Sequence, residues 1–211
     1  MREANRKAFL TAVSADPDIK PLPSFKFSRY GVDALLQLPD VVRRAIGETF
    51  RAVGGKGELG PNTLERFVKR LGSDDSLLID GDEFVVEYDE PQHFTTYRRT
   101  TLASSLYERL RVGFDPGNHA SLCASVSRTG TSGFDHNDSA HRAFECPGVP
   151  GDCRHRQRAF YDFLKDVLLG VGLNGIPRLI RISDREPGTS ESTQAAVDLL
   201  RRRASRALKK R

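Results

Sequence analysis

The order of helical and extended segments after residue 60 is the feature that most restricts the fold of this chain. Four segments have the residue pattern of helices: 61–72, 100–111, 155–172 and 189–210. Two short apolar segments, 76–80 and 83–88, flank a turn at Gly81 and Asp82 and predict a β-hairpin, and residues 177–183 predict a further strand. A chain with this order is expected to form a mixed α/β structure rather than a helical bundle or a β-sandwich.

The first 60 residues are organised differently. Residues 4–14 and 39–53 are each predicted to be helical, and the segment between them is rich in proline, so we expect the first helix to be an arm rather than part of the core. The sequence then divides into three regions: an N-terminal helical region at 1–60, an α/β core at 61–185 with a long insert at 113–154, and a basic C-terminal helix at 186–211.

The composition is that of a globular protein, with 38% hydrophobic and 29% charged residues. No apolar run approaches the roughly 20 residues that are needed to cross a bilayer. The N-terminal residues are charged and lack the apolar block of a secretory signal. We therefore expect a cytoplasmic protein with no membrane partner.

The C-terminal segment concentrates the positive charge of the chain, whose net charge is +5. The last 11 residues, RRRASRALKKR, carry seven basic side chains and no acidic one. Such a segment attracts the phosphate backbone of nucleic acids, although cations at the end of a solvated helix are also favourable without any partner. The candidate nucleic-acid contacts are Arg201, Arg202, Arg203, Arg206, Lys209 and Lys210.

The stretch EFVVEYDEPQH at 83–93 places several acids and an imidazole at the end of an apolar strand. Because side chains alternate along a strand, Glu87 and Asp89 are expected to point to the same face. Together with Asp80 or Asp82 from the adjacent turn they would form an oxygen-rich site suited to Mg²⁺. His93 would act as a general base or orient the attacking water. The alternative is a solvent-exposed strand end whose acids keep an edge soluble.

Three blocks of the sequence, FVVEYDEPQHF, RQRAFYDFLKD and GIPRLIRISDRE, resemble the PD-(D/E)xK nuclease superfamily. The pattern is most similar to the branch of the very-short-patch mismatch repair endonucleases, and the resemblance covers about residues 61–185. It implies a restriction-endonuclease-like mixed sheet flanked by helices, and Mg²⁺-dependent cleavage of DNA.

The resemblance also implies a set of site residues. The strand acids Glu87 and Asp89 would bind Mg²⁺, and the first acid of the motif remains open among Asp75, Asp80 and Asp82. The lysine of the motif is replaced by Asp89, so Lys165 or Arg158 on the later helix would take its place. The implied catalytic set is Glu87, Asp89, His93, Glu65, Lys165 and one of Asp80 or Asp82.

The insert gathers seven of the eight histidine and cysteine residues between positions 119 and 155. Four such ligands can hold Zn²⁺ and order a loop that has no apolar core of its own. The expected set is Cys146, Cys153 and His155, completed by Cys123 or His141. The mismatch repair endonucleases also carry a structural zinc, whereas the plainer alternative is a polar loop with a buried Cys123. A disulfide framework is not expected without an export signal.

Three functions are compatible with these features. The first is a Mg²⁺-dependent DNA endonuclease of the PD-(D/E)xK type. The second is a zinc-stabilised, catalytically inactive protein that binds nucleic acid. The third is a protein–protein interaction module whose basic tail contacts an acidic partner.

Overall fold

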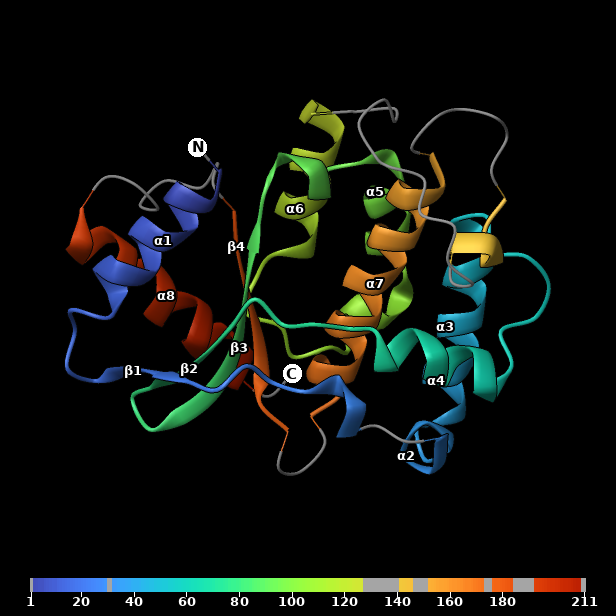
Figure 1. Cartoon of the computed structure of the whole chain (residues 1–211), viewed down its shortest axis with the longest axis horizontal. Coiled ribbons are helices and arrows are strands. Elements are labelled where there is room, and N and C mark those ends of the chain that lie inside the picture. The colour runs from blue at the N-terminus through green and yellow to red at the C-terminus, as the bar shows by residue number, and fades with distance from the viewer. Residues whose placement is uncertain are drawn as a thin grey trace.

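A four-stranded mixed sheet lies at the centre of the protein (Figure 1). The structure is a computed structural model that describes residues 2–29, 32–126, 141–145, 152–172, 176–183 and 192–209. The strands are β1 (Ile19–Leu22), β2 (Asp75–Ile79), β3 (Asp82–Asp89) and β4 (Arg178–Ser183), in the spatial order β1-β2-β3-β4. The pairs β1–β2 and β2–β3 are antiparallel and β3–β4 is parallel, so the expected mixed α/β class is confirmed.

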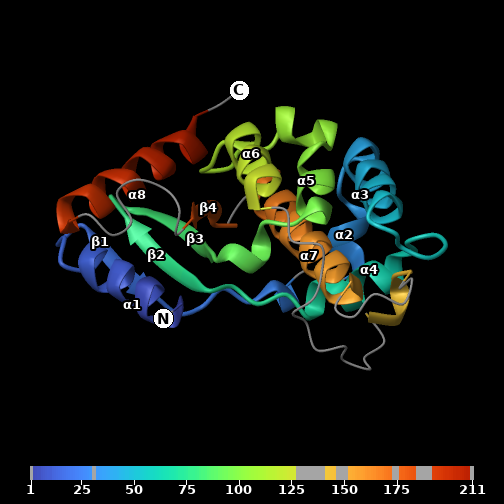
Figure 2. The same ribbon diagram turned by 90° about the horizontal axis from the view of Figure 1, so that it is seen from above.

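Helices cover both faces of the sheet (Figures 1 and 2). On β3, Phe84, Val86 and Tyr88 point toward helices α1 (Arg2–Val13) and α8 (Thr193–Leu208). The intervening residues of β3 face the opposite side, where Val85 packs in the larger core around α7 (Asp152–Gly170). The alternation of side chains along one strand therefore separates an apolar face from the face that carries Glu87 and Asp89.

The N-terminal segment is part of this structure and not an arm. Phe9 and Val13 of α1 are buried, and the ring of Phe9 lies 5.9 Å from that of Tyr88. Strand β1, which the sequence did not predict, pairs Ile19 with Ile79 at the edge of the sheet. An edge strand tolerates Pro21 because only one side of its backbone must form a ladder. The C-terminal helix is likewise a layer of the fold, with Leu200 fully buried.

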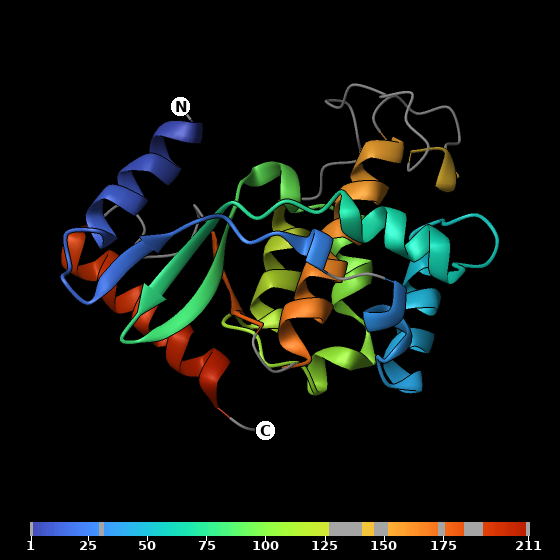
Figure 3. The same ribbon diagram turned by 60° about the horizontal axis from the view of Figure 1, so that its bottom comes forward.

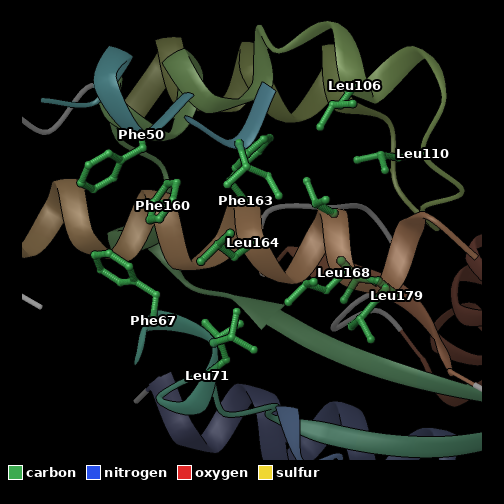
Figure 4. Close-up of a cluster of buried hydrophobic side chains, with 14 of the residues drawn as sticks. Phe50, Phe67, Leu71, Leu106, Leu110, Phe160, Phe163, Leu164, Leu168 and Leu179 are labelled. Carbon is green, nitrogen blue, oxygen red and sulfur yellow. The ribbon is translucent and has the colours of Figure 1, made fainter. Parts of the chain in front are cut away.

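The remaining helices pack around α7 on the other face (Figure 3). They are α2 (Val32–Leu36), α3 (Asp40–Ala52), α4 (Pro61–Lys69), α5 (Thr96–Leu102) and α6 (Pro116–Val126), with short 3₁₀ turns at Phe27–Arg29, Pro91–His93, Ser105–Glu108 and His141–Ala143. Phe50, Phe67 and Phe160 meet at centroid distances of 5.2–5.9 Å in tilted and edge-to-face arrangements (Figure 4). These contacts fix α7 against α3 and α4.

Two expected elements differ in detail. The helix expected at 100–111 is divided into α5 and the 3₁₀ turn Ser105–Glu108. The expected long loop contains α6, whose start was signalled by Asp115 and Pro116: the Asp115 carboxylate accepts a hydrogen bond from the backbone N–H of Asn118 at 2.9 Å. Residues 127–140 and 146–151 of the insert lie outside the described residues. Among the described helices, none is long and apolar enough to cross a membrane.

Candidate functional site

Glu87 and Asp89 point from β3 toward α7 and are 2% and 1% exposed. They therefore share one face of the strand, as the alternation predicted. Neither belongs to a solvated strand end, because Glu87 contacts Lys165 of α7 and Asp89 lies beside His93 of the 3₁₀ turn Pro91–His93. Glu87 pairs with Lys165, whereas Asp89 pairs with Arg181 and lies beside His93. The two carboxylates therefore belong to two neighbouring clusters.

The first, here called the acid–lysine cluster, consists of Asp74, Glu87 and Lys165. The Nζ atom of Lys165 lies 2.5 Å from Oε2 of Glu87, and the other carboxylate oxygen accepts a hydrogen bond from the backbone N–H of Asp74 at 3.3 Å. The Asp74 carboxylate accepts a hydrogen bond from the backbone N–H of Tyr88 at 3.0 Å. The loop between α4 and β2 thus brings a second acid beside Glu87.

Burial and neighbouring charges set the protonation of this cluster. Burial raises the pKa of Glu87, Lys165 opposes this shift, and the negative charge of Asp74 adds to it. Burial alone would lower the pKa of Lys165, but the negative charges of Glu87 and Asp162 together outweigh burial and raise it. Lys165 therefore stays charged at neutral pH.

The second, here called the inner cluster, consists of Asp89, His93 and Asp162, which come from the end of β3, from the 3₁₀ turn and from α7. Nδ1 of His93 is 2.9 Å from Oδ2 of Asp162 and 3.6 Å from Oδ1 of Asp89. One ligand atom from each residue lies within 4.8 Å of the other two. The His93 side chain is 19% exposed, and the two carboxylates are almost fully buried.

The ionisable groups of the inner cluster shift one another's pKa values. Burial opposes a charged imidazole, but Asp162 and Asp89 outweigh this effect and raise the pKa of His93. Burial also acts to raise the pKa of Asp162, yet His93 and Arg181 hold it well below its ordinary value. Burial raises the pKa of Asp89, and Arg181 and His93 only partly compensate.

Behind this cluster, Arg181 of β4 joins three acids of the interior. Its guanidinium group lies 2.7 Å from Oδ1 of Asp89 and 2.7 Å from Oδ1 of Asp166, and its Nη2 atom lies 3.5 Å from Oδ1 of Asp162. Arg98 of α5 pairs with the other oxygen of Asp166 at 2.6 Å. Three buried carboxylates therefore face two guanidinium groups, and the balance is negative unless His93 is protonated.

Two buried polar atoms near the inner cluster have no hydrogen-bond partner among the described residues: Oδ2 of Asp89 and Nε2 of His119. They lie 3.7 Å apart. The His119 ring is held between Phe94 and Phe114, with centroid distances of 5.0 and 5.4 Å. Burial, together with Arg98 and Arg181, lowers the pKa of His119 well below its ordinary value, so this imidazole is neutral.

Three predicted site residues lie elsewhere. The register pairs Ile79 with Asp82, so Asp80 and Asp82 are at the opposite end of the hairpin, about 16 Å along the strand from Glu87. They pair there with Arg201 and Arg178. Glu65 pairs with Lys69 on α4 at 2.8 Å, and the structure records no contact between Glu65 and Glu87. The prediction failed because Asp80 and Asp82 are close to Glu87 in sequence, whereas an antiparallel hairpin separates its turn from its open end.

Asp75, another candidate for the first acid, pairs with Arg6 of α1 at 2.9 Å, and its neighbour Asp74 takes the place beside Glu87. Arg158, the alternative to Lys165, donates to the backbone carbonyl of Gln92 at 3.4 Å. Of the two candidates on α7, Lys165 is the one that contacts Glu87.

The predicted zinc ligands are not brought together in the described part of the chain. Cys153 is disulfide-bonded, contrary to expectation, and a disulfide sulfur is not the thiolate that zinc requires. Cys123 is a buried free thiol on α6, and His155 is buried in α7. Cys146 and the side chain of His141 lie outside the described residues, so structural zinc stays a prediction.

The basic helix α8 is separated from both clusters by the sheet. Arg201 pairs with Asp16, Asp18 and Asp80, and Arg206 pairs with Asp115 at 2.7 Å. Arg202 and Lys209 are exposed, Arg203 is partly buried, and Lys210 lies outside the described residues. Part of the expected phosphate-binding charge is therefore used within the protein.

Four site residues were missed in the sequence: Asp74, Asp162, Asp166 and Arg181. A signal for three of them was available. Asp162 and Asp166 fall within the apolar stripe of α7 formed by Phe160, Phe163, Leu164 and Val167. A charged residue at a core position is rarely tolerated without a partner. Arg181 gave the same signal inside the apolar strand RLIRIS.

The fold and site define a three-layer α/β protein with buried acid–base clusters between β3 and α7. The chain belongs to a family of unknown function, DUF7255, whose model matches residues 48–201. This range includes every member of the two clusters. No curated protein and no solved structure matches the chain.

Proposed function

We propose that the protein is a divalent-metal-dependent phosphodiesterase that acts on DNA, of the PD-(D/E)xK type. The observation that carries the proposal is the distance of 2.5 Å between Lys165 and Glu87. The strand lacks the lysine of the motif, because Asp89 stands at that position. Lys165 of α7 supplies an ammonium group at the carboxylate of Glu87 instead. The net charge of +5 favours a polyanionic substrate.

The donors in the acid–lysine cluster fit Mg²⁺. Asp74 and Glu87 supply carboxylate oxygens, the ligands that this ion prefers, and they are close enough for the charge of Asp74 to raise the pKa of Glu87. These two residues would hold the ion, in place of the expected trio of Glu87, Asp89 and Asp80. A bound divalent ion would stabilise negative charge on the phosphodiester and lower the pKa of a water molecule.

The side chains around the cluster provide the remaining functions. Lys165 is 12% exposed and remains charged, so its ammonium group can hold an anionic phosphate oxygen or orient the attacking water. Arg158 lies two turns earlier on the same side of α7, and Arg6 borders Asp74 from α1. These cations would guide a phosphate backbone toward the edge between β3 and α7.

The test is a cleavage and nicking assay on duplex, mismatched and branched DNA with Mg²⁺ or Mn²⁺. Glu87→Gln and Lys165→Met should each lower the cleavage rate by at least about a hundredfold, because each removes charge stabilisation at the reacting phosphate. Asp82→Asn is the matched control, since Asp82 lies on the same strand at its far end, and it should keep the wild-type rate. Equal rates in the wild type and Glu87→Gln would remove the acid–lysine cluster from the mechanism.

A second function, nucleic-acid binding without catalysis, is favoured by one specific observation. Both strand acids already form ion pairs, Glu87 with Lys165 and Asp89 with Arg181, as purely structural acids do. This alternative predicts salt-dependent DNA binding with no turnover under any divalent metal. Binding that is unchanged in Glu87→Gln, together with no cleavage by the wild type, would select it.

A further inference from the structure

The inner cluster has the donors of a metal centre that differs from the Mg²⁺ site proposed above. We propose that Asp89, His93 and Asp162 bind one divalent first-row transition metal ion, with Zn²⁺ and Co²⁺ as suitable probes. This inference does not depend on nuclease activity. It rests on the convergence of three donors, on an unpartnered buried oxygen and on the charge balance of the interior.

The separations between the donor atoms are close to those of a ligand set. Two ligands that each lie about 2.1 Å from a tetrahedral zinc ion are about 3.4 Å apart. Nδ1 of His93 is 2.9 Å from Oδ2 of Asp162 and 3.6 Å from Oδ1 of Asp89, the oxygen that also faces Arg181. One ligand atom of each residue lies within 4.8 Å of the other two. Shifts of about an ångström would therefore bring the three donors to a common ion.

Asp89 has an oxygen available for this purpose. Its Oδ1 accepts a hydrogen bond from Arg181 at 2.7 Å, whereas its Oδ2 is buried and has no partner among the described residues. A buried carboxylate oxygen without a hydrogen bond or a cation costs free energy. A metal ion on Oδ2 would remove this cost and leave the pair with Arg181 in place.

His119 supports Asp89 from the other side. Its unpartnered Nε2 is 3.7 Å from the same Oδ2, and the ring is held by Phe94 and Phe114. An imidazole N–H that donates to a ligating carboxylate is a common way of orienting a metal ligand. We assign His119 this positioning role and not that of a ligand.

The charge balance permits a cation despite the nearby arginines. Arg181 and Arg98 are shared with Asp166, so Asp89, Asp162 and Asp166 exceed them by one negative charge. The positive charge of Arg158 also interacts with His93, and that of Lys165 interacts with the carboxylates of Glu87 and Asp162. A divalent ion held by the three donors would offset this deficit.

The donor set selects the kind of ion. One imidazole and two carboxylates suit Zn²⁺, Co²⁺, Fe²⁺ or Mn²⁺ better than Mg²⁺ or Ca²⁺, which prefer oxygen alone. His93 is partly exposed, whereas Asp89 and Asp162 are buried, so an ion would enter past the 3₁₀ turn Pro91–His93.

The experiment is a titration of the full, EDTA-treated chain with Co²⁺, followed by visible absorption, and with Zn²⁺, followed by calorimetry. The Glu87→Gln protein should still bind one ion per chain, since the acid–lysine cluster is not used. His93→Gln and Asp162→Asn should each weaken binding by at least about a hundredfold. Asp82→Asn is the control and should bind like the wild type.

A centre with only nitrogen and oxygen ligands lacks the strong near-ultraviolet band of cobalt–thiolate bonds. The visible and near-ultraviolet spectrum therefore distinguishes the proposed centre from a site in the cysteine-containing insert.

Two outcomes would overturn the inference: no specific binding by the wild type, or equal binding by wild type, His93→Gln and Asp162→Asn. Circular dichroism checks that the variants are folded. If a variant is not folded, nuclear magnetic resonance of the wild-type protein decides, because Co²⁺ must shift the His93 ring signals strongly. Absence of that shift rejects the site. The proposed nuclease function is tested separately by Mg²⁺-dependent cleavage, so either hypothesis can fail alone.

Discussion

Glu87 and Lys165 are 78 positions apart in the sequence, and their charged atoms are 2.5 Å apart in the structure. One residue lies on a central strand and the other on the helix that covers it. The pair is almost completely removed from water, with 2% and 12% of the side chains exposed. Its formation depends on how α7 packs on the sheet. Leu164 and Leu168 of α7 lie in the same buried apolar core as Val85 of β3 and Leu179 of β4.

Replacing Lys165 with methionine should lower the free energy of unfolding by about 3 kcal/mol at pH 7, because Glu87 would be left buried without its cation. Urea denaturation measures the change. The double variant Lys165→Met with Glu87→Gln should recover part of the loss. Lys69→Met is the matched control: its partner Glu65 lies one turn away on an exposed helix face, so the cost should be below about 0.5 kcal/mol. Equal costs for the two lysines would contradict this account.

Arg181→Met should destabilise the protein by about 3–5 kcal/mol, because Asp89, Asp162 and Asp166 would share no central cation. Arg178 offers a comparison on the same strand. It is 29% exposed and lies 3.8 Å from Asp82, so Arg178→Met should cost less than about 1 kcal/mol. Thermal and urea unfolding of both variants measure the difference, and a cost for Arg181→Met as small as that for Arg178→Met would refute a structural role for the network.

The stabilising contribution of His93 should depend on pH. Its pKa is raised in the folded state, so the contribution is complete below the ordinary histidine value of about 6.5 and is lost as the pH rises through the folded-state pKa. The difference in unfolding free energy between the wild type and His93→Gln, measured in EDTA, should therefore be largest below about pH 6 and should shrink as the pH rises through the folded-state pKa.

The pKa of His93 also measures the electrostatic effect of Asp162 on the imidazole. Removing its negative charge in Asp162→Asn should lower the pKa of His93, because the imidazolium would lose its closest carboxylate. Nuclear magnetic resonance of the His93 ring measures this pKa directly. An unchanged pKa in Asp162→Asn, or a stability difference that does not vary with pH, would show that the two residues are not coupled.

Gly113→Ala should destabilise the fold by about 1–3 kcal/mol, since an added methyl group would lie 2.7 Å from the carbonyl oxygen of Arg203 and 2.9 Å from Ile180. Gly113 also donates its backbone N–H to the carbonyl of Leu179 on β4, so the strand would have to move. Gly72→Ala is the control: nothing lies within 4 Å of its added Cβ, and a gain of up to about 1 kcal/mol is expected. Similar melting temperatures for the two variants would show that the contact at Gly113 can relax.

The first acid of the site shows where prediction from sequence reached its limit. Glu87 and Asp89 were placed on one face correctly because the period of a strand is local. Asp80 and Asp82 were chosen because they are near in sequence, but the register of the hairpin puts Asp74, at its open end, beside Glu87. A register is set by pairing between strands, and the residues of one strand alone do not specify it.

The edge of the sheet gives a second example. Strand β1 has only four residues and contains Pro21, so its sequence resembles a linker. It becomes a strand because β2 offers a free edge, and because Phe9 and Val13 of the preceding helix are buried against the same side of the sheet. Tertiary context decided this element against its local propensity.

The sequence by itself determined the alternation of helices and strands, the common face of Glu87 and Asp89 and the two candidate cations on α7, since each depends on spacings of a few residues. Only the tertiary structure decided that Lys165 meets Glu87, that Asp162 meets His93 and that Arg181 joins three acids. Those contacts link segments that are 15 to 92 positions apart. Packing of apolar surfaces brings such segments together, and the buried charges must then find partners within the space that the packing leaves.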